Sequence, residues 1–168
     1  TIIFNKRRRF GLYAAVVFMA VANSDASEAA KMTSINIGNW KGGAYSNDRN
    51  GQFSHCAASA NYKNGQTLLL SVSRDKTWSV GFANNRWNLD LGSKHPVRFK
   101  VDSGSAHGGT ATARTRYLAQ VMLPRSKQLF KQFQFGQRFY IKTRRSELSF
   151  DLTDVNRLLE TLVRCARH

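Results

Sequence analysis

From residue 35 onward, apolar and polar residues alternate with a period of two over several short segments. The clearest run is Val97, Phe99 and Val101, which are separated by two basic residues. This pattern predicts strands with one buried and one solvated face. Such strands are expected over residues 40–45, 53–62, 67–73, 78–83, 97–101, 110–116, 117–123, 138–142 and 148–152.

Glycine and asparagine mark the turns between these strands. Asn64-Gly65 predicts a two-residue hairpin, and the pair Gly42-Gly43 is expected to break the strand over 40–45. The glycine-rich segment 104–109, which contains His107, is expected to form a turn.

Two segments follow helical spacing instead. Residues 124–135 place apolar side chains at helical intervals, and Gly136 follows as a stop signal. Residues 153–167 form a stronger amphipathic pattern, with Thr153 or Asp154 as the cap. We therefore expect a mainly β (α+β) fold, an antiparallel sandwich or barrel of about eight strands, with the C-terminal helix packed on it and one shorter helix.

The first residues predict an export signal. A basic cluster over residues 6–9 precedes an apolar run over 11–22, which ends in the small-residue pattern Ala20-Val21-Ala22. The run is shorter than the ~20 residues that a membrane anchor needs. We expect a signal peptide over 1–22, with cleavage as late as residue 29, a flexible lead over 23–34 and a single β-rich domain over 35–168. The protein would then be periplasmic or extracellular, and a buried helix flanked by basic residues is the alternative.

The sequence contains two cysteines, Cys56 and Cys165. An even count in an exported protein favours a disulfide bond. Cys165 falls at the edge of the apolar stripe of the C-terminal helix, from which it can face the sheet and reach Cys56. Because neighbouring residues of a strand point to opposite faces, His55 and Cys56 are not expected to act as a nucleophile and its base. Two unrelated buried thiols are the alternative.

The 168 residues include 26 Lys and Arg against 10 Asp and Glu, for a formal charge of +16. Removing the four cations of the signal leaves +12. Such a surface attracts anions, and the candidate anion-binding residues are Arg98, Lys100, Arg114, Arg116, Arg138, Lys142, Arg144 and Arg145. The expected partner is an acidic envelope polymer, an anionic lipid surface or an acidic protein, and export argues against nucleic acid. A solvated basic surface that only maintains solubility is the alternative.

No catalytic motif accompanies these features. The histidines have no metal-binding spacing, and no phosphate-binding glycine loop or nucleophile elbow is present. We therefore expect no catalytic residues, no metal and no cofactor. Trp87, in an asparagine-rich segment, is a stacking candidate or a buried loop anchor.

Three stretches carry a family resemblance: residues 51–59 (GQFSHCAAS), residues 78–83 (WSVGFA), and the terminal helix that ends in Cys165. Together they resemble small exported α-proteobacterial proteins of the invasion-associated locus B type. They also resemble β-rich modules that accompany trypsin-like peptidases. The resemblance implies a β-sandwich in the cell envelope with a host-interaction or accessory role, and it supplies no catalytic residues.

These observations predict an exported, disulfide-bonded, basic binding domain of the bacterial cell envelope that is not an enzyme. The alternatives are an accessory or inhibitor module for a secreted peptidase, or a hydrolase whose site only the fold assembles.

Overall fold

The computed structural model describes residues 31–144 and 146–167. The expected signal peptide, most of the expected lead, Arg145 and His168 lie outside the described residues. The strands are β1 (Lys31–Ile37), β2 (Trp40–Ser46), β3 (Phe53–Asn61), β4 (Gln66–Ser73), β5 (Trp78–Asn84), β6 (Lys94–Val101), β7 (His107–Ala113), β8 (Leu118–Leu123), β9 (Arg138–Lys142) and β10 (Glu147–Asp151). The helices are α1 (Lys127–Phe135) and α2 (Val155–Cys165).

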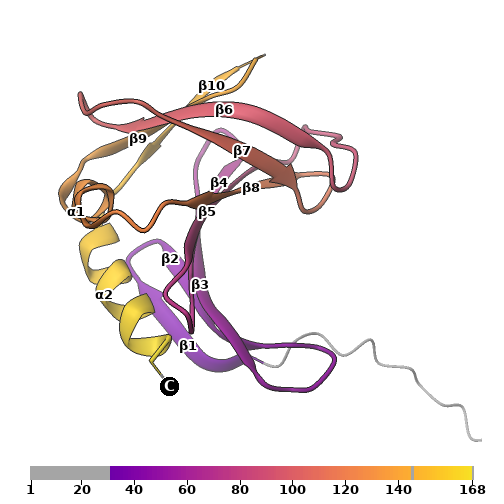
Figure 1. The fold of residues 1–168 in the computed structure, drawn as a ribbon, viewed down its shortest axis with the longest axis vertical. Helices are drawn as coiled ribbons and strands as arrows, with labels where there is room; N and C mark the ends of the chain where they lie inside the picture. Colours follow the sequence, from indigo (N-terminus) through magenta and orange to yellow (C-terminus); the bar gives the residue numbers. More distant parts are fainter. Residues whose placement is uncertain (1–30, 145, 168) are drawn as a thin grey trace, which may run out of the picture.

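All ten strands join one antiparallel sheet in the order β1-β2-β3-β4-β5-β8-β7-β6-β9-β10. The sheet is strongly bent: β6, β7, β9 and β10 lie in the upper half of Figure 1, and β1 to β3 lie below them. Both helices lie on the same side, at the left of the view. The mainly β class with two helices is confirmed. The strands form a single open sheet, because the helices cover its apolar face and no second sheet is needed.

The core lies between the helices and one face of the sheet. Hydrogen-bonded register aligns Cys56, Val72, Trp78 and Leu123 in one row across β3, β4, β5 and β8. All four side chains are buried. Helix α2 contributes Val155, Leu158, Leu159 and Leu162, and α1 contributes Leu129 and Phe133. The inward alternation predicted for these strands is confirmed.

Both helices begin close to where the sequence predicts. Ser126 caps α1, and its Oγ accepts the backbone N–H of Leu129 at 3.1 Å. Asp154 occupies the N-cap position of α2, but it has a left-handed backbone (φ 64°) and its side chain caps no helix N–H. Asp154 is thus the residue at the predicted cap position, but without the side-chain hydrogen bond that a cap normally supplies. Its carboxylate contacts Arg157 Nη1 at 3.5 Å instead.

The glycine pair does not interrupt β2, which runs continuously from Trp40 to Ser46. Gly42 is needed for a different reason: a Cβ atom there would collide with the carbonyl oxygen of Ala57 on β3. The hairpin after β3 forms as predicted but contains three residues rather than two, since Tyr62 N donates to Gln66 O at 2.8 Å. Gly65 adopts a φ of 76° at its last position.

Two boundaries differ from the sequence prediction. Residues 31–34 of the expected lead belong to β1, which pairs with β2 and buries Ile35. The expected turn over 104–109 ends earlier, because His107 is the first residue of β7 and pairs with Phe99. Gly108 and Gly109 therefore lie within β7, where they pair with Arg98 and Val97 of β6.

Candidate functional site: a cationic cleft

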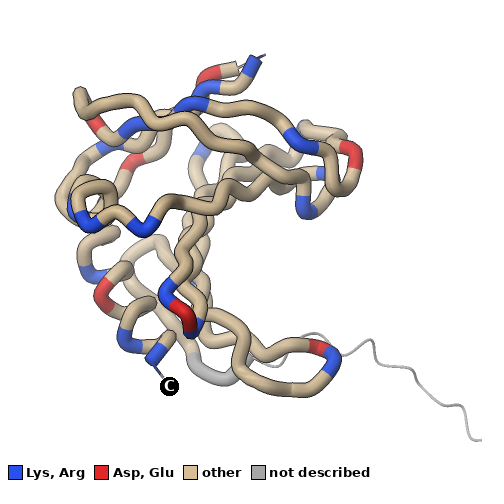
Figure 2. The backbone as a smooth tube through the Cα atoms, in the orientation of Figure 1, with Lys and Arg blue, Asp and Glu red and all other residues tan. Residues whose placement is uncertain are grey.

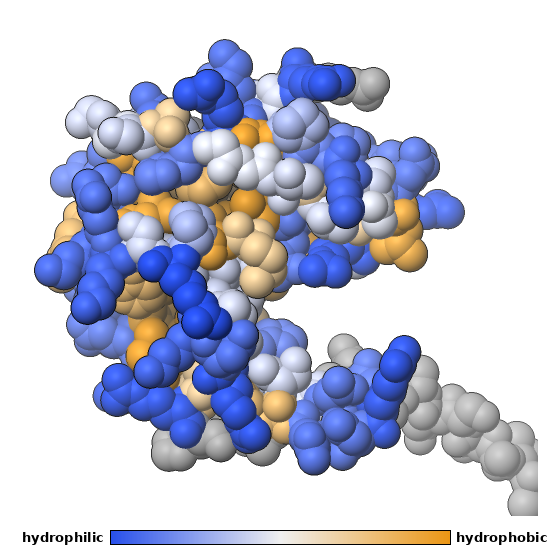
Figure 3. Space-filling model, in the orientation of Figure 1, coloured by the Kyte–Doolittle hydropathy of each residue, from blue (hydrophilic) through white to orange (hydrophobic). Residues whose placement is uncertain are grey.

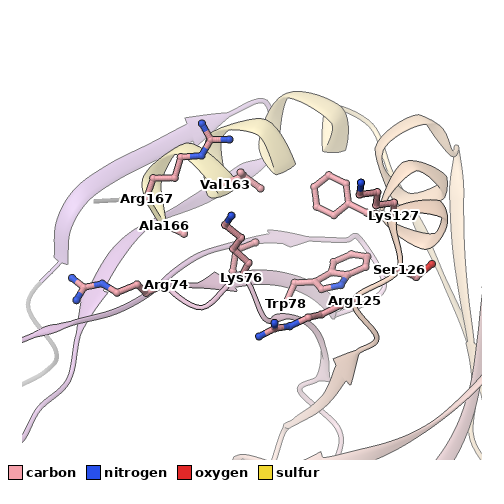
Figure 4. A pocket seen from close by; sticks show the side chains of 11 residues that line it. Arg74, Lys76, Trp78, Arg125, Ser126, Lys127, Val163, Ala166 and Arg167 are labelled. Atoms are coloured by element: carbon pink, nitrogen blue, oxygen red, sulfur yellow. The ribbon is translucent and has the colours of Figure 1, made fainter.

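A cleft of about 810 Å³ opens where the β4–β5 hairpin faces the start of α1 and the end of α2 (Figure 4). Each wall comes from a different part of the sequence, so only the folded chain brings them together. The lining residues are Val72, Arg74, Lys76, Trp78, Arg125, Ser126, Lys127, Phe130, Val163, Ala166 and Arg167.

Five of the described lining residues are cations, and none is a carboxylate. Arg74 and Lys76 come from the hairpin, Arg125 and Lys127 flank the cap of α1, and Arg167 follows α2. All five are exposed at the rim. Figure 2 shows basic positions at the hairpin tip, at the beginning of α1 and along α2. Like charges gathered around a hollow raise the local concentration of anions.

The hairpin turn is held by Asp75. Its carboxylate accepts hydrogen bonds from the hydroxyls of Ser73 and Thr77 and from the Thr77 backbone N–H. These bonds, together with the positive charge of Arg125, lower the pKa of Asp75 below its usual value. Lys76 beside it takes a left-handed backbone with φ 60°, which a lysine adopts only when the surroundings impose it. The turn thus fixes the position from which the Lys76 side chain extends.

Arg125 joins the hairpin to the segment before α1. Its Nη2 donates to the backbone oxygen of Asp75 at 2.9 Å and lies 3.5 Å from the Asp75 carboxylate. Within the described part of the chain, Arg125 is the one rim cation paired with a carboxylate. An exposed pair of this kind contributes about 0–1 kcal/mol. Among the described residues, no carboxylate neutralises the other four rim cations.

The floor of the cleft is apolar. Trp78 lies edge-on to Phe130, with ring centroids 5.3 Å apart. The indole N–H, the one polar group of Trp78, donates to Pro124 O at 2.9 Å. The ring therefore offers hydrocarbon to the cleft. Val163 and Ala166 lie across the cleft from Trp78, on the side that α2 supplies (Figure 4).

The predicted disulfide between Cys56 and Cys165 is present. It fastens the end of α2 to β3, beside the cleft floor, and the Cα atoms lie 6.1 Å apart. Cys56 is fully buried, while His55 lies on the other face of β3, as the strand argument predicted. The bond occupies both sulfurs, so neither is a nucleophile in this state.

The cations predicted from sequence lie elsewhere. Arg98 of β6 is directly opposite Lys142 of β9, and Lys100 Nζ lies 5.4 Å from the ring centroid of Tyr140. Their buried strand neighbours face the helices, so these cations project from the opposite face of the sheet. Two carboxylates are interleaved with them: Glu147 pairs with Lys142, and Asp151 with Arg138.

The remaining candidates form a separate group. Gly108, which pairs with Arg98, precedes Arg114 by six residues along β7 and the turn after it, a span of roughly 20 Å. Arg114 Nε donates to Gln120 Oε1 at 2.8 Å, and Arg116 is exposed nearby. Arg144 is exposed in the β9–β10 turn, and Arg145 lies outside the described residues. The predicted set is therefore divided between two parts of the sheet.

A second hollow, of about 390 Å³, lies on the face of β3, β4, β5 and β8 that is turned away from the helices. Ser79 is buried there and shares hydrogen bonds with Ser71 Oγ and Gln120 Nε2, both at 2.6 Å. His55 borders it, stacks on Tyr45 and lies 3.0 Å from Ser54 Oγ. Burial lowers the His55 pKa, which favours the uncharged ring. These polar groups satisfy one another.

The other histidines have separate surroundings. His95 contacts Ser93 Oγ at 2.9 Å, and His107 stacks on Phe99 with ring centroids 5.6 Å apart. In residues 31–144 and 146–167, no three His, Cys, Asp or Glu side chains come together as a metal site would require. Trp87 is half-buried and edge-on to Phe82, at 5.8 Å. Trp87 therefore anchors its loop against Phe82 of β5.

The rim cations were not among the sequence-predicted site residues. Four of them lie just outside a strand or helix, and Lys127 is the first residue of α1, so strand alternation gives no direction to their side chains. The sequence does contain one signal for them: Arg74 and Lys76 are close to Trp78, and Arg125 and Lys127 flank the α1 cap. Nothing in the sequence places these two groups opposite each other.

Comparison with solved structures identifies a similar fold. The crystal structure of invasion associated protein B from Bartonella henselae matches with a TM-score of 0.55 and 16% sequence identity. The match covers 78% of this chain and 95% of that chain. The resemblance predicted from the sequence is thus confirmed for the fold. No protein-family model matches the chain, and no curated protein matches it. Among the described residues, no helix has the length and apolarity to cross a membrane.

Proposed function

We propose that this protein is an exported binding domain of the bacterial cell envelope that takes up anionic ligands at the cationic cleft. The observation that supports the proposal most directly is the rim of five cations around a hollow whose described lining contains no carboxylate. A folded chain gains nothing from gathering like charges, because their mutual repulsion opposes compaction. A ligand that neutralises them would remove that cost.

Export is supported by two features. The basic cluster, short apolar run and small residues of positions 6–22 have the order of a secretory signal. The Cys56–Cys165 bond is of the kind that persists in oxidising compartments. The direct test is the intact mass of the chain produced with residues 1–30 in a Gram-negative host. A periplasmic product cleaved between Ala22 and Ala29, with no free thiol, is expected; an uncleaved product in the cytoplasm would contradict export.

Anion binding is tested with dextran sulfate, a soluble polyanion, by titration calorimetry. We expect binding at low salt and its loss near 1 M salt, where the Debye length is about 3 Å. The double variant Lys76→Gln/Arg167→Gln removes two exposed rim charges and should weaken binding about 10-fold, since each exposed ion pair contributes up to about 1 kcal/mol.

The pair Arg98→Gln/Lys142→Gln gives a matched comparison, because it removes the same charge from the opposite face of the sheet. We expect it to change binding less than about 3-fold. A larger loss in this pair than in the cleft pair would move the site to the β6–β9 surface predicted from sequence. Absence of binding by the parent protein at low salt would reject the anion-binding function itself.

A further inference from the structure

The floor of the cleft raises a question that its charges do not answer. A small inorganic anion needs donors, and an acidic polymer needs cations along an extended track. Neither needs the buried row of Val72 and Trp78 beneath the charges, or the half-buried Phe130 and Val163 beside it. We infer that the ligand is an amphiphilic anion, with a phosphate or carboxylate head on a single apolar chain. This inference rests on the proposed function.

The size of the hollow agrees with this ligand class. A cleft of about 810 Å³ lies within the range of about 300–1,000 Å³ in which protein sites enclose small-molecule ligands. The space-filling view of Figure 3, in the orientation of Figure 1, shows apolar surface between hydrophilic side chains in the part of the molecule where the helices lie. An alkyl chain would cover this surface, and its head would stay among the rim cations.

The rim cations suit such a ligand better than short polar residues would. Lysine and arginine carry long aliphatic stems that can lie along an apolar wall while the charged end stays in water. Lys76 rises from the hairpin beside Trp78 toward the α2 end, as Figure 4 shows. Arg74 already uses its planar end over an aromatic ring, 5.5 Å from the centroid of Phe53. The walls are therefore apolar near the floor and cationic at the mouth.

The test compares three probes at concentrations below micelle formation, with binding measured by calorimetry. Decyl phosphate has both head and chain, ethyl phosphate has the head with almost no chain, and decyl maltoside has the chain without the charge. Each buried methylene should tighten binding about 4-fold. We therefore expect decyl phosphate to bind at least about 100-fold more tightly than ethyl phosphate, and decyl maltoside to bind far more weakly than decyl phosphate.

Two variants separate the chain site from general adhesion. Val163→Ser places a hydroxyl in the apolar wall that α2 supplies and should weaken the binding of decyl phosphate at least about 5-fold. It should weaken the binding of dextran sulfate less, because it removes no charge. Phe135→Ser changes an apolar side chain that is 71% exposed at the end of α1, outside the cleft lining, and should change neither. Circular dichroism of both variants checks that they are folded. Equal losses in the two variants would mean that the chain adheres to the surface generally, which overturns the inference.

The remaining outcomes distinguish this inference from the proposed function. Equal affinity for ethyl and decyl phosphate would leave an anion site without a chain site, so the inference fails and the proposed function stands. Equal affinity for decyl maltoside and decyl phosphate would also overturn the inference. Competition by phosphatidylglycerol vesicles but not phosphatidylcholine vesicles would assign the amphiphile to a membrane, whereas competition by neither would assign it to a free amphiphile. Either result of this vesicle competition supports an amphiphile-binding site in the cleft.

Discussion

Cys56 and Cys165 are bonded to each other, and each lies next to a residue that lines the cleft. Cys56 pairs across the sheet with Val72, and Cys165 immediately precedes Ala166. The disulfide therefore holds one wall of the cleft, the end of α2, against the sheet that forms its base. Stability and ligand binding are expected to depend on the same bond.

Removing the disulfide tests this dependence. In Cys56→Ala/Cys165→Ala, the unfolded chain regains the freedom of a loop spanning 109 residues. We expect the free energy of unfolding to fall by about 2–4 kcal/mol, measured by urea denaturation. A reducing agent should lower the stability of the parent protein by a similar amount and should not change the double variant. A parent protein whose midpoint is insensitive to reduction would contradict the prediction.

Gly42 is predicted to be intolerant of any side chain. In Gly42→Ala the new Cβ would meet the Ala57 carbonyl and the Ala58 Cα of the adjoining strand, and these backbone atoms cannot move independently. We expect a loss of about 2 kcal/mol or more in thermal or urea denaturation. Gly108→Ala is the matched control in β7, because no atom lies within 4 Å of its Cβ. It should change stability by less than about 1 kcal/mol, and similar losses at both glycines would refute the steric explanation.

Two carboxylates should make the fold sensitive to acid. Hydrogen bonds from Ser73 and Thr77 lower the pKa of Asp75, and hydrogen bonds from Thr153 lower the pKa of Asp151, each below the ordinary value of 3.8. As the pH falls, the unfolded chain therefore binds more protons than the folded chain does. The stability that these groups contribute is lost below about pH 4.

The double variant Asp75→Asn/Asp151→Asn isolates this effect. Its urea midpoint should fall less steeply than that of the parent protein between about pH 4 and pH 2, because the amides do not titrate. At neutral pH it should be less stable than the parent, since an amide oxygen accepts these hydrogen bonds less strongly than a charged carboxylate does. Identical slopes for the two proteins would show that other groups cause the acid sensitivity.

Tyr62 should make the stability of the fold depend on pH in the alkaline range. Burial, followed by the nearby negative charge of Asp151, raises its pKa from 10.0 to about 12. Its hydroxyl donates to the backbone oxygen of Asp151 at 2.6 Å, which joins the end of β3 to β10. The unfolded chain releases this proton first, so the stability contributed by Tyr62 is lost as the pH rises from 10 through 12.

Tyr62→Phe should remove that alkaline component and cost about 1 kcal/mol at neutral pH, because one hydrogen bond is lost while the ring still packs edge-on to Phe150. Urea denaturation at a series of pH values measures both effects. Ultraviolet titration of the tyrosines checks the shift directly. An alkaline decline that is unchanged in the variant would assign it to other groups.

The sequence by itself determined most of the local structure and the pairing of the cysteines. Alternation located the strands because a half-buried strand exposes every second residue, as Val97, Phe99 and Val101 show. The helical stripe placed Cys165 toward the sheet, and the disulfide follows that geometry. The glycine pair of β2 was misread, since the reason for Gly42 is the closeness of β3.

Only the tertiary structure decided which cations act together. Arg98 and Lys142 are prominent in the sequence because they alternate with apolar residues, yet their strands carry them to the face opposite the helices. Lys76, Arg125 and Arg167 lie beyond the ends of regular elements and are far apart in the chain, so no periodicity connects them. They meet because the sheet bends and α2 packs back across it, and long-range packing of this kind leaves no mark on local sequence.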